Sequence, residues 1–304
     1  MQAVLLCALF LSACTPGAAP LPDHSEAPAH SGPPQREEAQ VRTGGGWLPA
    51  PDKRLPRAPG RLAGDLRRVT EALKVSLDGW AEGGTLSWAR RPPRDVVLQS
   101  LYHQRIVRRM SKHPVLARRV VARSEERLGR VSRVLARAGA KLRSLVTPVS
   151  PSFEFRTQRP EPAGDLSRYY HGAQRRFGVH WSVLASINLV ETKFGRVRSQ
   201  SSAGAQGPMQ FLPATWDAYG MGGDIQDAHD AIFGAANYLR ASGAPAHLRR
   251  ALFAYNNADS YVDAVMIYAR LMRMRPRRFL MFYNQQVFVI TTRGDVRITG
   301  PGLN

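Results

Sequence analysis

Apolar residues recur every three or four positions along most of the chain, which is the spacing of one face of an α-helix. The pattern predicts a helix from Leu62 to about Trp80, a second that begins after Pro93, and a third from about Pro114 to Leu145. The third keeps a three-four alternation, as in the seam of a helical bundle. We therefore expect residues 61–147 to form a small all-helical domain with arginine on its outer faces.

The second half of the chain predicts further helices after a proline-rich break at 147–162, because proline cannot continue a helix. The first two helices are expected in GDLSRYYHGAQRRF, which Gly178 closes, and in VHWSVLASINLVETKFG, which Gly195 stops. A short helix is expected near Pro213, and a longer one between an Asp227 cap and Gly243. The last two helices are expected in HLRRALFAYNN and SYVDAVMIYARLMRM. Glycine and aspartate are typical of such helix ends. These helices define a second unit, residues 162–275.

The tail, residues 276–304, follows a different pattern. The stretch QQVFVITTRGDVRITG alternates apolar and polar positions and is rich in β-branched residues around a glycine-containing turn at 292–295, which predicts a β-hairpin. We interpret the Arg-Gly-Asp triplet in that turn as turn chemistry. The whole pattern predicts a mainly α fold with one small C-terminal hairpin.

The first sixty residues lack helical periodicity. The opening MQAVLLCALFLSACTPGAAP has an apolar run too short to span a bilayer, followed by small residues, as in an export signal. Its Leu11-Ser12-Ala13-Cys14 resembles the lipobox of bacterial lipoproteins, which implies a signal peptide over 1–14 and a lipidated Cys14. The absence of Lys and Arg before the run leaves open an ordinary secretory signal or an upstream start. Residues 15–60, rich in Pro, Gly, Ala and Ser, are expected to be a linker.

The formal net charge of +20 narrows the range of partners, because such a field attracts polyanions. An exported chain rarely meets nucleic acid, and basic residues alone bind it only nonspecifically, so we expect no specific nucleic acid. An anionic wall polymer or membrane surface fits better, and solvated arginine-rich helix faces remain the simpler explanation. Both cysteines lie in the first fourteen residues, so the rest of the chain has no thiol for a disulfide or a nucleophile.

No metal or cofactor is expected, because the histidines are scattered without paired spacing on a helix. His180 lies one turn before Leu184 and is interpreted as a packed or capping residue.

One carboxylate interrupts the apolar pattern. On the helix through NLVETKFG, Glu191 projects from the middle of an apolar arc that runs from Val183 to Phe194. Burial and the negative end of the helix dipole both raise the pKa of such a carboxyl, and an acid that stays protonated near neutrality can donate a proton. The alternative is a structural carboxylate, satisfied by Arg196 or a backbone amide or rotated outward at a frayed helix end.

Two later segments add side chains suited to a sugar. SSAGAQGPMQF, 201–211, carries small residues that let backbone approach a ligand, with Met209 for apolar contact and Gln210 as an amide. AYNN, 254–257, adds Tyr255 and Asn256. A sugar ring needs both flat apolar surface and hydrogen-bonding groups, so the segments together indicate a glycan site.

In this order, VETKFG, AGAQGPMQF and AYN resemble the soluble lytic transglycosylase (SLT) domain of the lysozyme-like superfamily, over about residues 165–275. The resemblance implies a lysozyme-like all-helical catalytic domain that cleaves peptidoglycan with Glu191 as the single acid and base. It also implies substrate-binding residues: Gly207, Met209, Gln210 and Tyr255 in the cleft, and Ser201 or Ser202 near the acetamido group. The chain departs from the commoner pattern after Glu191, where many members have serine, and at Asn257-Ala258.

A single acid suits a lytic transglycosylase, because hydrolysing glycosidases usually need two carboxylates. The aspartates of the second unit fall in short-helix and capping contexts, where Asp normally bonds backbone amides: Asp217, Asp224, Asp227 and Asp230. In a transglycosylase the substrate's own C6 hydroxyl attacks the anomeric carbon and leaves a 1,6-anhydromuramoyl end. We therefore expect an exported, lipid-anchored enzyme of the bacterial cell envelope that acts on peptidoglycan glycan strands. A muramidase and a non-catalytic peptidoglycan-binding or scaffolding lipoprotein remain alternatives.

Overall fold

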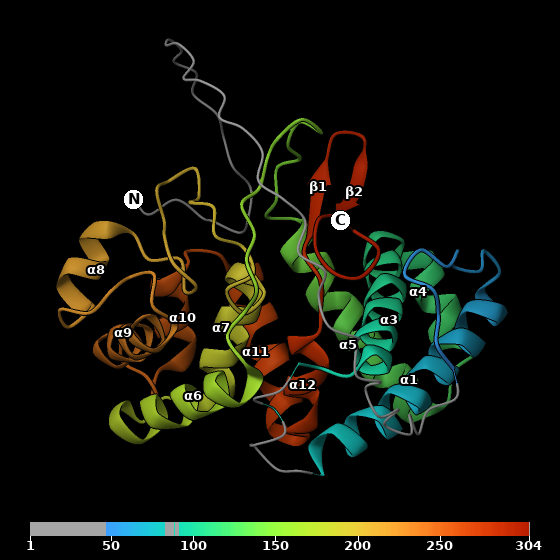
Figure 1. The fold of residues 1–304 in the computed structure, drawn as a ribbon, viewed down its shortest axis with the longest axis horizontal. Helices are drawn as coiled ribbons and strands as arrows, with labels where there is room; N and C mark the ends of the chain where they lie inside the picture. Colours follow the sequence, from blue (N-terminus) through green and yellow to red (C-terminus); the bar gives the residue numbers. More distant parts are fainter. Residues whose placement is uncertain (1–46, 83–87, 89–90, 304) are drawn as a thin grey trace, which may run out of the picture.

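The structure is a computed structural model, and it describes residues 47–82, 88 and 91–303. These residues are mainly helical, as predicted, with one two-stranded sheet (Figure 1). The expected signal peptide, Cys14 and most of the linker lie outside the described residues. In the part of the chain that is described, no helix combines the length and the apolar character needed to cross a bilayer.

The first group of helices is built on the predicted apolar stripes. Helix α3 (Arg94–Lys112) packs against both α1 (Pro59–Ala81) and α5 (Glu126–Arg143), and α4 (Pro114–Val121) contacts all three. Its core consists of the following buried residues: Leu62, Ala63, Leu66, Val69, Tyr102, Ile106, Met110, Val120 and Ala136.

The prediction of one continuous helix from Pro114 to Leu145 was wrong. The chain turns between α4 and α5, where the Ser124 amide bonds the Val121 carbonyl and the Ser124 hydroxyl bonds the Val120 carbonyl. In a straight helix Val120 and Ala136 would lie about 24 Å apart. The turn instead folds α4 back on α5 and buries both side chains in one cluster.

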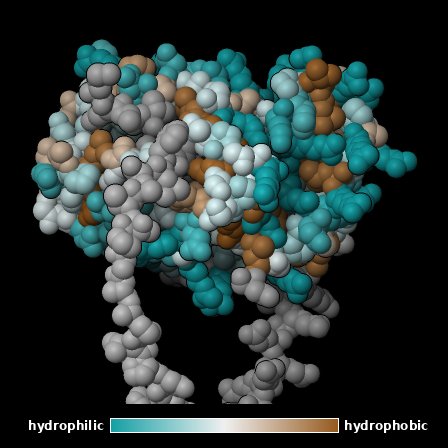
Figure 2. All heavy atoms as spheres, turned by 90° about the horizontal axis from the view of Figure 1, so that it is seen from above, coloured by the Kyte–Doolittle hydropathy of each residue, from teal (hydrophilic) through white to brown (hydrophobic). Residues whose placement is uncertain are grey.

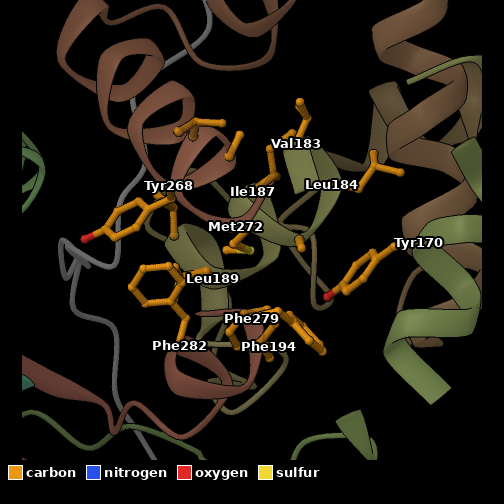
Figure 3. Packing of buried hydrophobic residues seen from close by; sticks show 14 of the residues in the cluster. Tyr170, Val183, Leu184, Ile187, Leu189, Phe194, Tyr268, Met272, Phe279 and Phe282 are labelled. Atoms are coloured by element: carbon orange, nitrogen blue, oxygen red, sulfur yellow. The ribbon is translucent and has the colours of Figure 1, made fainter. Parts of the chain in front are cut away.

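The second group of helices surrounds α7 (Trp181–Thr192), in which every residue from Ser182 to Thr192 is buried. Helix α11 (Asp259–Met274) packs along α7. The rest of the group comprises α6 (Ala163–Phe177), α8 (Pro213–Tyr219), α9 (Ala228–Ala241) and α10 (Leu248–Tyr255). Figure 3 shows Ile187 and Leu189 of α7 close to Met272 of α11 in the core between them.

Three residues that the sequence predicts at helix ends lie at helix ends in the structure. Helix α6 ends at Gly178, whose φ is 74°. The Asp227 carboxylate caps α9 by accepting from the Asp230 amide at 3.0 Å. The His180 ring caps α7 by accepting from the Ser182 amide at 3.2 Å, which confirms its interpretation as a capping residue.

Helix α7 ends earlier than predicted, at Thr192 rather than at Gly195. Three consecutive residues take left-handed conformations: Lys193, Phe194 and Gly195, with φ of 54°, 63° and 81°. Such a conformation is costly for a bulky residue. It is held because Phe194 is buried against Phe279, with ring centroids 5.5 Å apart.

Phe279 belongs to a helix that the sequence did not predict, α12 (Arg277–Tyr283). It lies in the region assigned to the hairpin tail and is too short to show a helical period. The predicted hairpin follows it: β1 (Phe288–Thr291) pairs antiparallel with β2 (Gly294–Arg297), and Thr292 and Arg293 form the turn.

The two groups of helices share a continuous apolar core. Helix α5 packs along α11, and α1 packs against α12. Residues of both groups, such as Leu135 of α5 and Val265 of α11, belong to one buried cluster. The division into separate units at 61–147 and 162–275 therefore stays a prediction. The face that carries the hairpin is largely hydrophilic, and its hydrophobic residues form separate patches (Figure 2).

Candidate active site

Glu191 lies in the last turn of α7 and is only 3 % exposed. Burial raises its pKa from 4.5 to about 8, and the Tyr261 hydroxyl and the Lys193 ammonium oppose this shift by favouring the charged form. Desolvation dominates because few compensating charges surround the carboxyl. The structure thus contains the buried acid that the apolar arc predicted, protonated at neutral pH.

Two parallel tyrosines stand beside this carboxyl. The rings of Tyr255 and Tyr261 stack with centroids 6.5 Å apart and an interplanar angle of 7°. Burial, followed by the proximity of Glu191, raises the pKa of both phenols well above the ordinary value. Both hydroxyls therefore stay protonated, and each keeps a proton with which to donate a hydrogen bond.

Arg196, the partner considered for a purely structural Glu191, makes other contacts. Its guanidinium donates to the Lys193 carbonyl at 2.9 Å and lies 5.0 Å from the centre of the Tyr283 ring. The outward rotation also considered for Glu191 does not occur, since the side chain is buried.

Glu191 lines a hollow of about 50 Å³, which we call the first hollow. Its other lining residues come from the loop after α7 and from α8, α9 and α10: Ala203, Ala205, Gln210, Phe211, Leu212, Thr215, Tyr238, Tyr255 and Asn256. The aromatic rings of Phe211, Tyr238 and Tyr255 meet edge to face. Flat apolar surface, two amides and a neutral acid form the combination that suits a sugar ring.

Asn256 supplies the clearest sign of a ligand in this hollow. The residue is buried, and its Oδ1 atom has no hydrogen-bond partner among the described residues. Buried polar atoms are normally paired, so this carbonyl is available to accept from a donor that enters the hollow.

The loop 206–211 forms one wall and is fixed at several points. Gln206 and Phe211 exchange two backbone hydrogen bonds of 2.8 and 2.9 Å. The Tyr255 hydroxyl donates to the Met209 carbonyl at 2.6 Å, and the Thr192 hydroxyl donates to the Pro208 carbonyl at 2.7 Å. The loop is therefore tied both to the end of α7 and to α10.

Of the residues predicted to bind substrate, Gln210, Tyr255 and Asn256 line the first hollow with Glu191. Gly207 and Met209 lie in the loop but face elsewhere. A Cβ atom on Gly207 would lie 1.8 Å from the Ile225 carbonyl oxygen, so this glycine allows two backbone segments to meet. The Met209 side chain is part of the core.

The two serines predicted near the acetamido group lie on the approach to this loop. Ser201 accepts a 2.8 Å hydrogen bond from the Ala205 amide and so holds a turn, and Ser202 is exposed. Neither is among the residues that line the first hollow. Their contacts with substrate, like those of Gly207 and Met209, stay predictions.

Sequence reasoning missed Phe211, Tyr238 and Tyr261. Phe211 and Tyr238 have the sequence context of ordinary core residues, and only the fold brings them beside Glu191. Tyr261 lies six positions after Tyr255 and across the break between α10 and α11, so helical spacing does not connect the two rings. Phe211 ends the AGAQGPMQF segment, but the sequence assigns it no role, and no sequence signal identifies Tyr238 or Tyr261.

The comparisons with known proteins agree with this geometry. The sequence profile of the family described as "Transglycosylase SLT domain" matches residues 168–269. These residues form an SLT domain. The match contains α7 to α10, the loop 206–211 and most of α11.

A curated relative supports the same assignment. The chain is similar to the membrane-bound lytic murein transglycosylase F of Thiobacillus denitrificans, with 29% identity over 174 residues. The similar region covers 53% of this chain and 36% of the relative, so the chain spans little more than a third of that protein's length. No solved structure matches the chain significantly.

The SLT domain provides one wall of a second hollow, of about 140 Å³, which Glu191 also lines. The opposite wall comes from α3, α5 and β1, outside the family match. In Figure 1, α7 and α11 stand between α8 to α10 on one side and α3 and α5 on the other. Among the described residues, Glu191 is the only carboxylate that lines either hollow.

One group of side chains in the SLT domain is of the kind that can bind a metal ion, although the sequence predicts no metal site. The ligand atoms of Asp227, His229 and Asp230 lie within 4.8 Å of one another. Asp227 caps α9, and Asp230 accepts from the Asp224 amide at 3.0 Å and contacts the His229 ring. These contacts are those of helix capping, as predicted for Asp224, Asp227 and Asp230.

Proposed function

We propose that this chain is a peptidoglycan lytic transglycosylase that cleaves the β-1,4 bond between MurNAc and GlcNAc. The observation that carries the proposal is the environment of Glu191, a buried acid with a pKa of about 8 that lines both hollows without a second carboxylate in the described part of the chain. The SLT domain and the relative named a lytic murein transglycosylase support the substrate class.

In the first step, Glu191 donates its proton to the glycosidic oxygen while the bond from that oxygen to the anomeric carbon breaks. The substrate's acetamido group stabilises the positive charge that develops at the anomeric carbon. The carboxylate left on Glu191 is stabilised by the Tyr261 hydroxyl and the Lys193 ammonium, which favour the charged form.

In the second step, the Glu191 carboxylate removes the proton of the C6 hydroxyl as its oxygen attacks the anomeric carbon. The product is a 1,6-anhydromuramoyl end, and Glu191 is protonated again. No water is consumed, so a second carboxylate to activate water is not required.

The first hollow holds the sugar in position for these steps. Asn256 Oδ1 accepts from a donor of the sugar, because it has no partner among the described residues. Gln210 also lines the hollow, and its side-chain amide donates to the Gly207 carbonyl at 3.0 Å. This bond uses the amide nitrogen, so the side-chain carbonyl remains as a further acceptor. Tyr255 and Tyr238 offer aromatic surface to the ring.

The proposal is tested by digesting purified peptidoglycan sacculi and analysing the products by mass spectrometry. The wild-type chain should release anhydromuropeptides, and Glu191→Gln should release none. Products heavier by one water would identify a muramidase instead. Binding to sacculi without products from the wild type would identify a non-catalytic binding protein.

We also propose that the enzyme works in the cell envelope, held by a lipidated Cys14. The lipobox supports this, as does the relative described as membrane-bound. The net charge of +20 would draw the chain to anionic wall polymer or the membrane surface. Retention on sacculi should therefore weaken as salt is raised.

A further inference from the structure

The second hollow places a basic surface directly beside the proposed acid. Glu191 and Lys193 contribute to it from the end of α7, and Arg108 of α3 and Arg143 of α5 line it from the opposite wall. Three cationic side chains therefore line a hollow of about 140 Å³ that Glu191, neutral below pH 8, also lines. Most of the remaining wall is apolar, and Gln104, Ser111, Tyr268 and Gln285 add polar groups to it. The apolar side chains are those of Val107, Leu142, Val146, Val190, Val197, Val287, Phe288 and Ile290.

The basic wall is held rigidly. Asp295 of β2 accepts from Arg108 at 2.6 Å and from both terminal nitrogens of Arg143 at 3.0 and 2.5 Å. The Arg108 guanidinium also lies 4.5 Å from the centre of the Phe288 ring. Asp295 is the aspartate of the Arg-Gly-Asp triplet interpreted as turn chemistry, and the structure gives it this clamping contact instead.

A second contact fixes the hairpin to α3. The Gln104 side chain donates to the Gln286 carbonyl and accepts from the Gln286 amide, both at 2.8 Å. The segment before β1 is therefore tied to α3, and the wall of the second hollow is preformed.

The charge on this wall is not fully compensated. One carboxylate, Asp295, bonds two guanidinium groups. The side chains of Arg108 and Arg143 are 26% and 23% exposed to solvent. Burial lowers the pKa of Arg108, which shows that its charge is held at a cost in desolvation. A bound carboxylate would offset that cost, because guanidinium and carboxylate form strong charge-assisted pairs.

We infer that the second hollow binds a carboxylate of the peptide attached to the peptidoglycan glycan strand. The inference rests on the proposed function, because Glu191 lines this hollow and a group joined to the sugar whose bond Glu191 cleaves would therefore lie close to it. The wall peptide is joined to that sugar, carries carboxylates and has short aliphatic side chains that suit the apolar part of the hollow. A free phosphate or a wall phosphate polymer has no such tether to the sugar beside Glu191.

The inference assigns a function to segments outside the SLT domain. Helices α3 and α5 and the hairpin would make the enzyme prefer strands that carry peptides over strands from which the peptides have been removed. Arg143 and Arg108 would be the residues that set this specificity.

The test measures binding, so that it does not depend on cleavage. The full chain with Glu191→Gln is titrated with glycan strands that carry peptides and with the same strands stripped of peptides by an amidase. We expect about tenfold tighter binding of the peptide-bearing strands, which is the effect of one charge-assisted contact of about 1.4 kcal/mol. Adding Arg143→Gln should remove most of this preference and leave the affinity for stripped strands unchanged.

The matched control is Asp295→Asn in the same background, which weakens the clamp but keeps both arginines. It should retain the preference. Equal affinity for the two kinds of strand, a preference that survives Arg143→Gln, or an equal loss for both strands in both variants would overturn the inference. If the wild type released no anhydro products, the transglycosylase proposal would be wrong, and this result would not depend on which strands the protein binds more tightly.

Discussion

The Thr192 hydroxyl donates a 2.7 Å hydrogen bond to the Pro208 carbonyl. It also accepts a 2.8 Å hydrogen bond from the Gly195 amide. Thr192 directly follows Glu191, so one buried hydroxyl joins the end of α7 to the loop 206–211 and fixes the left-handed turn between them. The position of the acid relative to the wall of the first hollow therefore depends on this residue.

Thr192→Val keeps the shape of the side chain but leaves the Pro208 carbonyl and the Gly195 amide without this partner. Unpaired buried groups cost about 1–3 kcal/mol each, so we expect the two together to lower the free energy of unfolding by about 2–6 kcal/mol. Release of anhydromuropeptides should also be slower. Denaturant titration and a digestion time course measure the two effects. Thr70→Val is the control, because its hydroxyl bonds only the Leu66 carbonyl in its own helix. Equal effects of the two substitutions would contradict the argument.

Gly207→Ala should disrupt the loop 206–211. The added Cβ would lie 1.8 Å from the Ile225 carbonyl oxygen, and φ at this position is 73°. The two backbone segments would have to separate, so we expect a loss of more than about 3 kcal/mol in the free energy of unfolding and weak glycan binding. Thermal unfolding and binding to sacculi give the measurements.

Gly204→Ala is a close control for this substitution. Its φ of 78° is nearly the same, but an added Cβ meets nothing within 4 Å. Only the left-handed strain remains, which costs about 1 kcal/mol. If both alanines proved equally mild, the contact between Gly207 and Ile225 would not be what fixes the loop.

Local sequence signals predicted those parts of the site that depend on one helix. Glu191 lies on an apolar arc whose burial is set by α7 itself, and His180 and Asp227 cap helices through atoms two or three residues away. Their positions follow from helical geometry, which the sequence contains.

The remaining parts depend on contacts between distant segments, for which a single sequence carries no signal. Tyr261 reaches Glu191 only because α11 packs along α7. Asp295 meets Arg143 across 152 positions of sequence. The short helix α12 forms because Phe279 and Phe282 are buried in the core rather than because of periodicity.

Cys14→Ser should abolish lipid attachment in cells. The prediction follows from the Leu11-Ser12-Ala13-Cys14 sequence, in which cleavage would leave Cys14 as the lipidated first residue. Incorporation of a labelled fatty-acid analogue should be seen for the wild type and lost in this variant. Cys7→Ser is the matched control, because Cys7 lies inside the apolar run, and it should keep the label. Absence of label from the wild type would favour an ordinary secretory signal.

Glu191→Gln should separate catalysis from folding. Gln cannot donate or remove a proton, so we expect anhydromuropeptide release to fall by at least about 10³-fold. The free energy of unfolding should instead increase. The folded state keeps the Glu191 proton up to a pKa of about 8, whereas the unfolded chain loses it near 4.5, so the carboxyl's contribution to stability is lost as pH rises between these values.

The Gln variant lacks this titration. Its free energy of unfolding should therefore exceed that of the wild type by an amount that grows from pH 5 to pH 8, with a slope of at most about 1.4 kcal/mol per pH unit. Denaturant titrations of both proteins at several pH values measure the difference. A difference that does not change with pH would show that Glu191 ionises like an exposed carboxyl.

The pH dependence of cleavage should report the same group. In the free enzyme the first step requires protonated Glu191, so kcat/KM should be sustained at neutral pH and should fall as pH rises through about 8. The Lys193 ammonium favours the charged form of Glu191 and holds its pKa down. Lys193→Gln should therefore move the alkaline limb of the profile to higher pH. A shift of that limb to lower pH, or a fall that begins near 4.5, would mean that another group controls the rate.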